Sequence, residues 1–512
     1  MAERCAVPEE SRLNPHVVSI RNGTESEYLM RVLVNGLAAA GSKTGIGHYT
    51  AQLLRCLSEQ TDADEIDAFP RPWVCRARSL WARFRSRLEP AAPVASVLPT
   101  APDSPDRLSW RGRAMRSLRS SGQWLLARHF RTTSQRGGFN LYHETNYIPL
   151  PSELPTVATI HDLSVLLHPE WHPADRVAHF ERRFLHGLTQ CVHFLAISEF
   201  GRQEIIRTLH LRPEQVTRTY MGIRPGLMPL PEEQVQESRR QLGLPPRYLL
   251  FVGTIEPRKN VGMLLRAYCS LPSALREQYP LVLSGSWGWN AGDVARFLEE
   301  EGRSRGVLHL GYVAEQHLAA LYNGARALVY PSLYEGFGLP PVEMMACGGA
   351  VLASTAGALM ETVGDWAHLV DPNDLEGWRD AMVRVIEDDD WWYSLRRGVV
   401  EAASSFTWEQ CAADTLKVYR ALSGEEKRPA PHAASFGLRA RTPAAPHRGA
   451  AACCGQGRTE PGARGLSGTA EGESDARRPQ LSTRDGGADG GRPLHGRTPA
   501  LLAHAGGGRR SN

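Results

Sequence analysis

Short apolar runs that end in glycine alternate with amphipathic stretches over most of residues 30–423. The first run, residues 30–36, reads Met-Arg-Val-Leu-Val-Asn-Gly, which is typical of a buried strand. A glycine-containing loop follows at residues 40–47, and residues 48–58 then carry apolar side chains at helical spacing. A strand, a glycine loop and a helix in this order form the first unit of a nucleotide-binding sheet.

The same alternation continues through the first half of the chain. Further strands are expected at residues 139–142, 156–160 and 192–197, and helices at residues 176–188 and 199–209. Strands that alternate with helices favour a parallel sheet that is covered by helices on both faces.

The pattern then starts again at residue 247. Residues 247–253 form a second apolar run that ends in glycine, and a polar loop and a helix at 261–270 follow it. Later strands are expected at residues 281–284, 307–310, 327–330 and 350–353. The sequence therefore predicts an α/β protein with two Rossmann-like domains that face each other across a substrate cleft.

Composition places the expected boundaries. Residues 424–512 are rich in Arg, Gly, Ala, Pro and Ser and poor in large apolar residues, so we expect this tail to be disordered. The remaining divisions are a disordered extension (1–29), an N-terminal acceptor domain (30–228), a Pro-rich linker (229–246), a C-terminal donor domain (247–405) and a closing helix (406–423).

Residues 71–136 are read as a basic amphipathic insertion in the first domain. Arginines interleave there with apolar residues at helical spacing, among them Trp73, Trp81 and Phe84. This pattern suits an anionic membrane surface, and it equally suits a solvated helix pair that packs on the first domain. Nucleic acid is not expected as a partner, because the net charge is only +4 and no recognised binding module accompanies the arginines.

The cysteine pattern points to a reducing compartment, and the hydropathy gives no sign of a membrane-spanning segment. None of the nine cysteines lies in a Cys-x-x-Cys pair, so they are expected to be core residues and no metal site is predicted. The N-terminus lacks a signal-peptide pattern, and no run of about 18 apolar residues occurs. We expect a cytoplasmic protein, with peripheral attachment to the membrane left open.

Two glutamates flank a glycine-rich turn in Glu335-Gly-Phe-Gly-Leu-Pro-Pro-Val-Glu343. The turn leads into a helix expected at 341–346, whose N–H groups suit an anion or sugar hydroxyls. Glu343, placed in the first turn, could accept hydrogen bonds from a ribose diol. The alternative is a helix N-terminus that merely favours acidic residues.

Adjacent cations follow the strand at 247–253. Arg258 and Lys259 lie between this strand and the next helix, which places both at the expected cleft. Fixed cations there can neutralise a departing diphosphate. An ordinary solvated basic loop is the alternative.

Together these motifs resemble the fourth family of retaining glycosyltransferases, also called group 1, which has the two-Rossmann type B fold. The residues that carry the likeness are Phe251-Val-Gly-Thr-Ile-Glu-Pro-Arg-Lys-Asn260, Gly311-Tyr-Val313 and the paired-glutamate motif. The likeness extends from about residue 30 to 422, apart from the insertion.

The resemblance implies a role for particular residues. Arg258 and Lys259 would hold the donor diphosphate, Glu343 the ribose, and Glu335 would face the transferred sugar. The other expected contacts are Gly45 and Gly47 in a loop over the diphosphate, His161 beside the donor sugar, main chain at Tyr312 and Val313 for the base, and backbone amides at Phe337, Gly338 and Leu339 for sugar and phosphate.

The resemblance also implies front-face substitution with retention, without a metal or another cofactor. The sequence around His161, such as Tyr142-His-Glu-Thr-Asn-Tyr147, is similar to that of bacterial enzymes that build O-antigen and exopolysaccharide with mannosyl or rhamnosyl donors. We therefore expect a GDP-linked, mannose-type donor and a saccharide or lipid-linked saccharide acceptor.

Three alternatives stay open. A nucleotide-sugar epimerase shares the fold, and a non-catalytic nucleotide-sugar-binding protein would keep it without turnover. A dehydrogenase is disfavoured, because Thr44-Gly-Ile-Gly47 lacks the Gly-x-Gly-x-x-Gly spacing.

Overall fold

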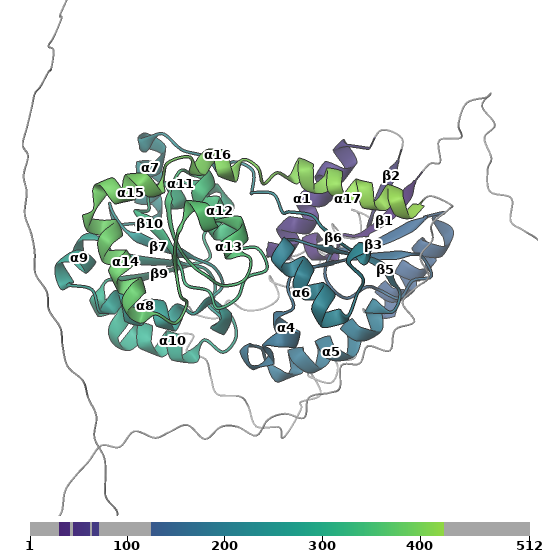
Figure 1. Cartoon of the computed structure of the whole chain (residues 1–512), viewed down its shortest axis with the longest axis horizontal. Helices are drawn as coiled ribbons and strands as arrows, with labels where there is room; N and C mark the ends of the chain where they lie inside the picture. The colour runs from purple at the N-terminus through teal and green to yellow at the C-terminus, as the bar shows by residue number, and fades with distance from the viewer. Residues whose placement is uncertain (1–29, 41–44, 62–63, 71–123, 424–512) are drawn as a thin grey trace, which may run out of the picture. The chain divides into compact units, whose positions relative to one another are not determined.

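The computed structural model describes residues 30–40, 45–61, 64–70 and 124–423. The expected disordered segments 1–29 and 424–512 lie outside the described residues, as do residues 71–123 of the insertion. Two six-stranded parallel sheets, each with its own helices, account for the described chain (Figure 1).

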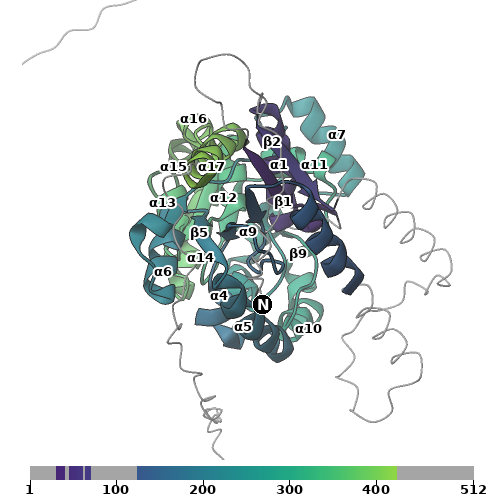
Figure 2. The ribbon, with the colours of Figure 1, turned by 90° about the vertical axis from the view of Figure 1, so that its right-hand side faces the viewer.

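The first sheet has the strand order β2-β1-β3-β4-β5-β6. Its strands are β1 (Arg31–Asn35), β2 (Glu65–Phe69), β3 (Leu141–Glu144), β4 (Thr156–Ile160), β5 (Cys191–Ala196) and β6 (Val216–Arg218). The helices of this half include α1 (Gly45–Glu59), α4 (Ser164–Leu167), α5 (Ala174–Leu188) and α6 (Glu199–Leu209), with short 3-10 turns η1 (Leu37–Ala40), η2 (Pro169–Trp171) and η3 (Pro213–Gln215). The view in Figure 2 shows α1 beside β1 and β2.

The second sheet has the order β12-β11-β10-β7-β8-β9. Its strands are β7 (Leu249–Val252), β8 (Leu281–Ser284), β9 (Val307–Gly311), β10 (Ala327–Tyr330), β11 (Ala350–Ser354) and β12 (His368–Val370). The helices are α7 (Glu232–Leu242), α8 (Val261–Cys269), α9 (Ser273–Gln278), α10 (Gly292–Phe297), α11 (Glu315–Asn323), α12 (Leu339–Ala346), α13 (Leu359–Thr362), α14 (Leu375–Glu387), α15 (Asp389–Leu395), α16 (Val399–Ala403) and α17 (Trp408–Ser423).

Complete burial of the central strands explains why their sequences are continuously apolar. Every residue of β4, β5, β8, β10 and β11 is buried, so both faces of each sheet are covered. The two-domain α/β architecture expected from the sequence is therefore confirmed, and the central strands lie within one or two residues of their expected positions.

Three short strands were not expected, namely β2, β6 and β12, and all lie at the edges of their sheets. A short edge strand carries charged or polar residues, as Glu-Ile-Asp-Ala-Phe in β2 does, and its pattern does not stand out. The expected linker at 229–246 also contains a helix, α7, whose one buried residue is Val235. Its remaining residues are mostly charged or polar, which concealed the helical period.

Helix α17 packs back onto the first half of the chain, alongside α1 (Figure 1). Gln60 donates a hydrogen bond to the backbone carbonyl of Glu409 (2.8 Å), and Tyr419 forms a 2.5 Å hydrogen bond with Nδ1 of buried His143. At the start of α17, the indole of Trp408 donates to the carbonyl of Ile223 (2.9 Å). A buried hydrogen bond at Tyr419 and further hydrogen bonds at Gln60 and Trp408 therefore anchor this helix.

Residues 124–136, the described end of the insertion, are helical. Phe130 is buried, and Leu126 packs against the small core cluster around Phe69 and Tyr142. Trp124 and Leu125 are 62% and 58% exposed. This helix thus packs one apolar face on the first domain while two large apolar residues stay on the surface.

The described helices include none with the length and apolar character needed to cross a membrane. Five of the cysteines, Cys56, Cys191, Cys269, Cys347 and Cys411, are free thiols and buried. For these five, the expectation of core cysteines is confirmed.

The hydrogen bond between Tyr419 and His143 predicts a measurable loss of stability. Tyr419→Phe leaves Nδ1 of a fully buried imidazole without its partner, which should lower the free energy of unfolding by about 1–3 kcal/mol. Urea unfolding measures this change. Tyr393→Phe is the matched control, since Tyr393 is 60% exposed and the same substitution there should change stability little. Equal stabilities of the two variants would contradict the anchoring role.

Candidate functional site

The adjacent cations Arg258 and Lys259 lie in a 3-10 turn, η4 (Pro257–Lys259), which follows β7. Asn260 ends this turn in the left-handed region (φ 56°), a conformation that asparagine tolerates better than most residues. Its side-chain amide donates to the carbonyls of Pro331 (3.2 Å) and Pro372 (2.8 Å). The turn is thereby fixed to the loop after β10.

Lys259 is buried and reaches two partners in that neighbouring segment. Its ammonium donates to Oε1 of Glu335 (2.5 Å) and to the hydroxyl of Tyr330 (2.6 Å) at the end of β10. The ammonium also lies 5.0 Å from the centre of the Tyr330 ring. The structure thus brings two of the predicted site residues, Lys259 and Glu335, into direct contact.

Arg258 joins the same cluster through several acceptors. Its guanidinium contacts Glu335 (3.3 Å), Glu256 (3.0 Å) and the backbone carbonyl of Tyr334 (3.3 Å). It also lies 3.9 Å from Oδ2 of Asp162, which follows β4 of the first sheet. The cluster therefore joins the carboxyl ends of strands from both sheets.

Burial and pairing act against each other on these groups. Burial alone would raise the pKa of Glu335, but Lys259 and Arg258 outweigh it and the pKa is lowered. Burial lowers the pKa of Lys259, against the opposing effect of Glu335. For Asp162, burial is again outweighed, here by Arg258 and by hydrogen bonds from Ser164, and the pKa is lowered. The two cations therefore favour the ionised forms of Glu335 and Asp162.

Glu343 has a different environment. It is fully buried in α12, accepts a hydrogen bond from Tyr322 (2.7 Å), and its Oε1 lies 3.3 Å from Nε of Arg224. Burial raises the pKa of Glu343, with Arg224 opposing. The expected position in the first helical turn is wrong: α12 begins at Leu339, two residues earlier than expected, which places Glu343 in the second turn.

Glycines allow the segment after Glu335 to approach its neighbours. A Cβ atom on Gly336 would lie 2.1 Å from the backbone oxygen of His161, so no larger residue fits. Gly338 has φ +88° and is the residue from which α12 starts. Close contact with His161 therefore depends on glycine at position 336.

His161 follows β4 and is 6% exposed. Its Nε2 lies 2.9 Å from the carbonyl oxygen of Thr145, and the rings of Tyr49 and Tyr147 meet the imidazole edge-on. A carbonyl can only accept, so Nε2 carries the hydrogen. Burial lowers the pKa of His161, so the neutral ring presents Nδ1 as an acceptor.

The other predicted residues take varied positions. Tyr312 is 69% exposed, and Val313 and Phe337 are buried. The ring of Phe337 packs edge-on against Phe406, which leaves its backbone as the part that can meet a ligand. Gly45 and Gly47 were expected in a loop, but they lie in the first turn of α1, since the helix begins three residues before its expected start.

Several residues of the site were missed from the sequence. Asp162 directly follows His161, and Glu256 lies two residues before Arg258. Both could have been identified from the sequence as carboxylates close to Arg258 in the expected fold. Arg224 and Tyr322, which contact Glu343, carry no motif of their own. Among the described residues, no group of three or more His, Cys, Asp or Glu could hold a metal ion.

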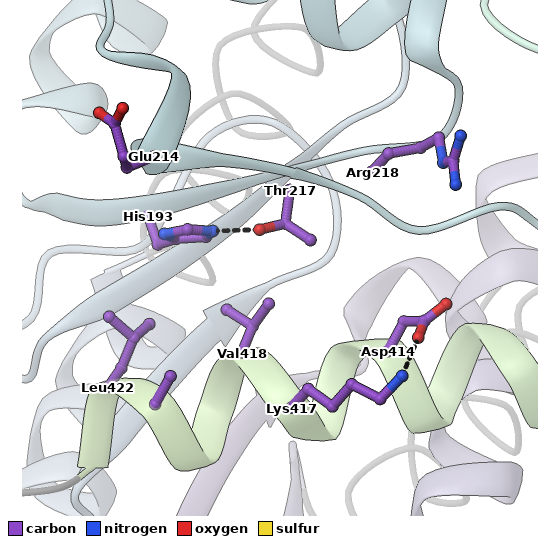
Figure 3. A pocket seen from close by; sticks show the side chains of 9 residues that line it. His193, Glu214, Thr217, Arg218, Asp414, Lys417, Val418 and Leu422 are labelled. Carbon is purple, nitrogen blue, oxygen red and sulfur yellow. Dashed lines mark hydrogen bonds and ion pairs between the residues drawn. The ribbon is translucent and has the colours of Figure 1, made fainter.

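A surface pocket lies between α17 and the edge formed by β5 and β6 (Figure 3). In it His193 is hydrogen bonded to Thr217 (2.8 Å), and Lys417 to Asp414 (2.8 Å). None of the predicted site residues lines it; the lining residues are His193, Glu214, Thr217, Arg218, Asp414, Lys417, Val418, Ala421 and Leu422. The predicted site residues Arg258, Lys259 and Glu335 therefore lie away from this pocket.

Comparison with known proteins concerns the family of the chain. Residues 234–405 match the family model of glycosyl transferases group 1. The chain is 33% identical over 391 residues to O-antigen chain mannosyltransferase B of Escherichia coli, covering 74% of this chain and 96% of that protein. It is 31% identical over 264 residues to the serotype-specific mannosyltransferase WbdA of the same species, covering 50% of this chain and only 32% of that longer protein.

A solved structure shares the fold. The sucrose-phosphate synthase of Thermosynechococcus elongatus superposes with a TM-score of 0.55 at 22% identity, covering 77% of this chain and 99% of that chain. This likeness concerns the two-domain type B fold alone. Taken with the sequence similarity over nearly the full length of a mannosyltransferase, it leads to one conclusion: the chain is a glycosyltransferase and belongs to the group 1 family.

Proposed function

We propose that this glycosyltransferase is retaining and metal-independent, and that it transfers a mannose-type hexose from a GDP-linked donor. The acceptor would be a saccharide or lipid-linked saccharide in cell-surface polysaccharide synthesis. The similarity to an O-antigen chain mannosyltransferase supports the sugar and the pathway class. The adjacent cations Arg258 and Lys259, both ion-paired with Glu335 at the strand ends, are the observation that carries the proposal.

Each of the two cations retains an N–H group that can bind a diphosphate. Hydrogen bonds among the described residues use four of the five N–H groups of Arg258 and two of the three of Lys259. One N–H on each side chain is then left for a phosphate oxygen. Neighbouring carboxylates hold both cations in place, so little reorganisation is needed when charge develops on the leaving group.

The start of α12 supplies further donors. Pro340 and Pro341 lack N–H groups, so the backbone donors at this helix end are concentrated at Gly338 and Leu339. The positive end of the helix dipole favours an anion at the same place. We assign these two amides, with that of Phe337, to sugar hydroxyls and phosphate.

Glu343 is assigned to the ribose hydroxyls. Its Oε1 has no aligned hydrogen bond among the described residues, although Arg224 lies 3.3 Å away. An acceptor oxygen that is buried without a donor is costly, and a ribose hydroxyl would satisfy it. The main chain at Tyr312 and Val313 would meet the base, and Gly45 and Gly47 in α1 would lie over the diphosphate.

In the proposed reaction the bond between the anomeric carbon and the phosphate oxygen breaks. The acceptor oxygen forms its bond on the same face, and its proton passes to the departing diphosphate. Catalysis then rests on orientation of the two substrates and on stabilisation of the diphosphate by Arg258 and Lys259, whose charges take the place of a metal ion. Neutral His161 can accept a hydrogen bond from a sugar hydroxyl through Nδ1.

A membrane contact through the insertion forms part of the proposal. Trp124 and Leu125 are exposed on the helix at 124–136, and the guanidinium of Arg128 lies 5.7 Å from the Trp124 ring. Exposed tryptophan beside arginine suits the interface of an anionic bilayer. A lipid-linked acceptor would be presented at such a surface.

The proposed donor is tested by a panel of nucleotide sugars with chelator present, scored by thermal stabilisation and slow donor hydrolysis. GDP-mannose at about a hundred times its Kd should stabilise the protein by about 3 kcal/mol. Arg258→Ala should abolish the effect, because it removes a fixed cation, whereas Arg266→Ala on the exposed face of α8 should preserve it.

The outcomes separate the alternatives. Stabilisation that needs a divalent cation would contradict metal independence, and a different responding nucleotide would replace GDP. Transfer to an acceptor, with the anomeric configuration read by NMR, distinguishes a retaining transferase from an epimerase, which would return an altered nucleotide sugar. Binding of a nucleotide sugar without turnover would favour a non-catalytic nucleotide-sugar-binding protein.

The ribose assignment predicts a selective loss of donor affinity. Glu343→Gln removes a charged acceptor and should weaken donor binding roughly ten- to a hundredfold, as expected for a hydrogen bond to a charged group. Calorimetric titration with the donor nucleotide measures the change. The control is Glu387→Gln at the exposed end of α14, for which donor Kd should stay as in the wild type. An unchanged Kd in Glu343→Gln would remove Glu343 from the donor site.

A further inference from the structure

Glu144, a buried carboxylate that the proposed mechanism does not use, is the last residue of β3. It is 1% exposed and accepts three hydrogen bonds, from Asn35 Nδ2 (2.6 Å), the Tyr142 hydroxyl (2.7 Å) and the backbone N–H of Asn146 (2.8 Å). Burial raises its pKa to about 7, against those three donors. A group this costly to bury needs a structural reason.

That reason lies in a single peptide group. The N–H of Asn146 and the C=O of Thr145 belong to the same peptide unit. Its N–H points to Oε1 of Glu144, and its C=O accepts from Nε2 of His161 (2.9 Å). In a planar trans peptide these two groups point in opposite directions, so an acceptor on one side fixes the carbonyl on the other.

The rest of the segment holds the same orientation. The Thr145 hydroxyl donates to the carbonyl of Asn35 (2.8 Å) and accepts from Thr50 (3.0 Å). Tyr147 adopts φ 60°, which a bulky residue avoids unless its surroundings enforce it, and its ring meets His161 edge-on. Several contacts within this turn thus fix the orientation of the Thr145–Asn146 peptide.

We propose that Glu144 is a positioning residue that selects the tautomer of His161 through the Thr145–Asn146 peptide. With Glu144 as acceptor, the carbonyl faces His161, the hydrogen stays on Nε2, and Nδ1 is kept as the acceptor for a substrate hydroxyl. A reversed peptide would present N–H to Nε2 and favour a hydrogen on Nδ1, so the substrate would meet a donor instead. The consequence for transfer rests on the proposed function; the consequence for the tautomer does not.

The test uses Glu144→Met in the full chain, because methionine keeps the length of the side chain and removes the acceptor. Long-range proton–nitrogen NMR of histidine-labelled protein reads the His161 tautomer, with His161→Gln for assignment. We expect a single Nε2–H tautomer in the wild type and a mixture in the variant. In the transfer assay, kcat should fall roughly ten- to a hundredfold, as for a misplaced site group, while donor KM changes less than about threefold.

Val385→Ala in α14 is the control for destabilisation, since it changes a fully buried residue in the second half of the chain. It should keep wild-type kcat per folded molecule and a single tautomer. If Glu144→Met does not fold, Glu144→Asp takes its place: the shorter carboxylate draws back from Asn146, and the same changes are expected. An unchanged tautomer or an unchanged kcat would overturn the proposal. If the wild type transfers no sugar, the proposed function fails, while the NMR comparison still decides the role of Glu144.

Discussion

A buried lysine and a largely buried arginine at the carboxyl ends of β7 and β10 determine much of the surrounding structure. A buried ammonium or guanidinium is tolerated only with ionised partners at close range. Glu335 meets both cations, and Glu256 and Asp162 complete the surroundings of Arg258. Removal of one partner would leave an uncompensated charge in a desolvated site. The free-energy cost of that unpaired charge is far larger than the net stabilisation that the ion pair itself provides.

The pairing of these charges explains the backbone conformation of the loop that carries Glu335. Glu335 can reach Lys259 because the chain passes close to two other segments, and glycine is present at each approach. A Cβ on Gly336 would overlap the carbonyl oxygen of His161, and one on Gly357 would lie 2.4 Å from the carbonyl oxygen of Glu335. The Glu335 carbonyl also accepts the N–H of Ala358 (2.9 Å). The electrostatics of the site and its glycines therefore form one constraint, since the ion pairs need the close approach.

The parts that the sequence predicted well share a physical cause. Fully buried strands such as β4 and β8 are continuously apolar, so their pattern alone identifies them. Edge strand β2 is short and carries two acidic residues, and helix α7 is largely polar, so neither stands out from the neighbouring loops. Among the site residues, the placement of Lys259 and Glu335 at the cleft followed from their motifs, although their direct contact was not predicted. The pairing of Arg224 with Glu343 did not, because it joins residues more than a hundred positions apart and outside any motif.

The two glutamates of one motif show why spacing alone does not assign a role. Glu335 has a lowered pKa, because two cations outweigh its burial, whereas the pKa of Glu343 is raised by burial that Arg224 only partly offsets. The first carboxylate is thus a fixed charge that orients the cations. The second has an oxygen without an aligned donor and lacks strong ionic compensation, which suits a group whose hydrogen bonds are completed by a ligand. Their different surroundings, set by residues far away in the chain, separate an ion-paired carboxylate from the one that is proposed to bind the ribose.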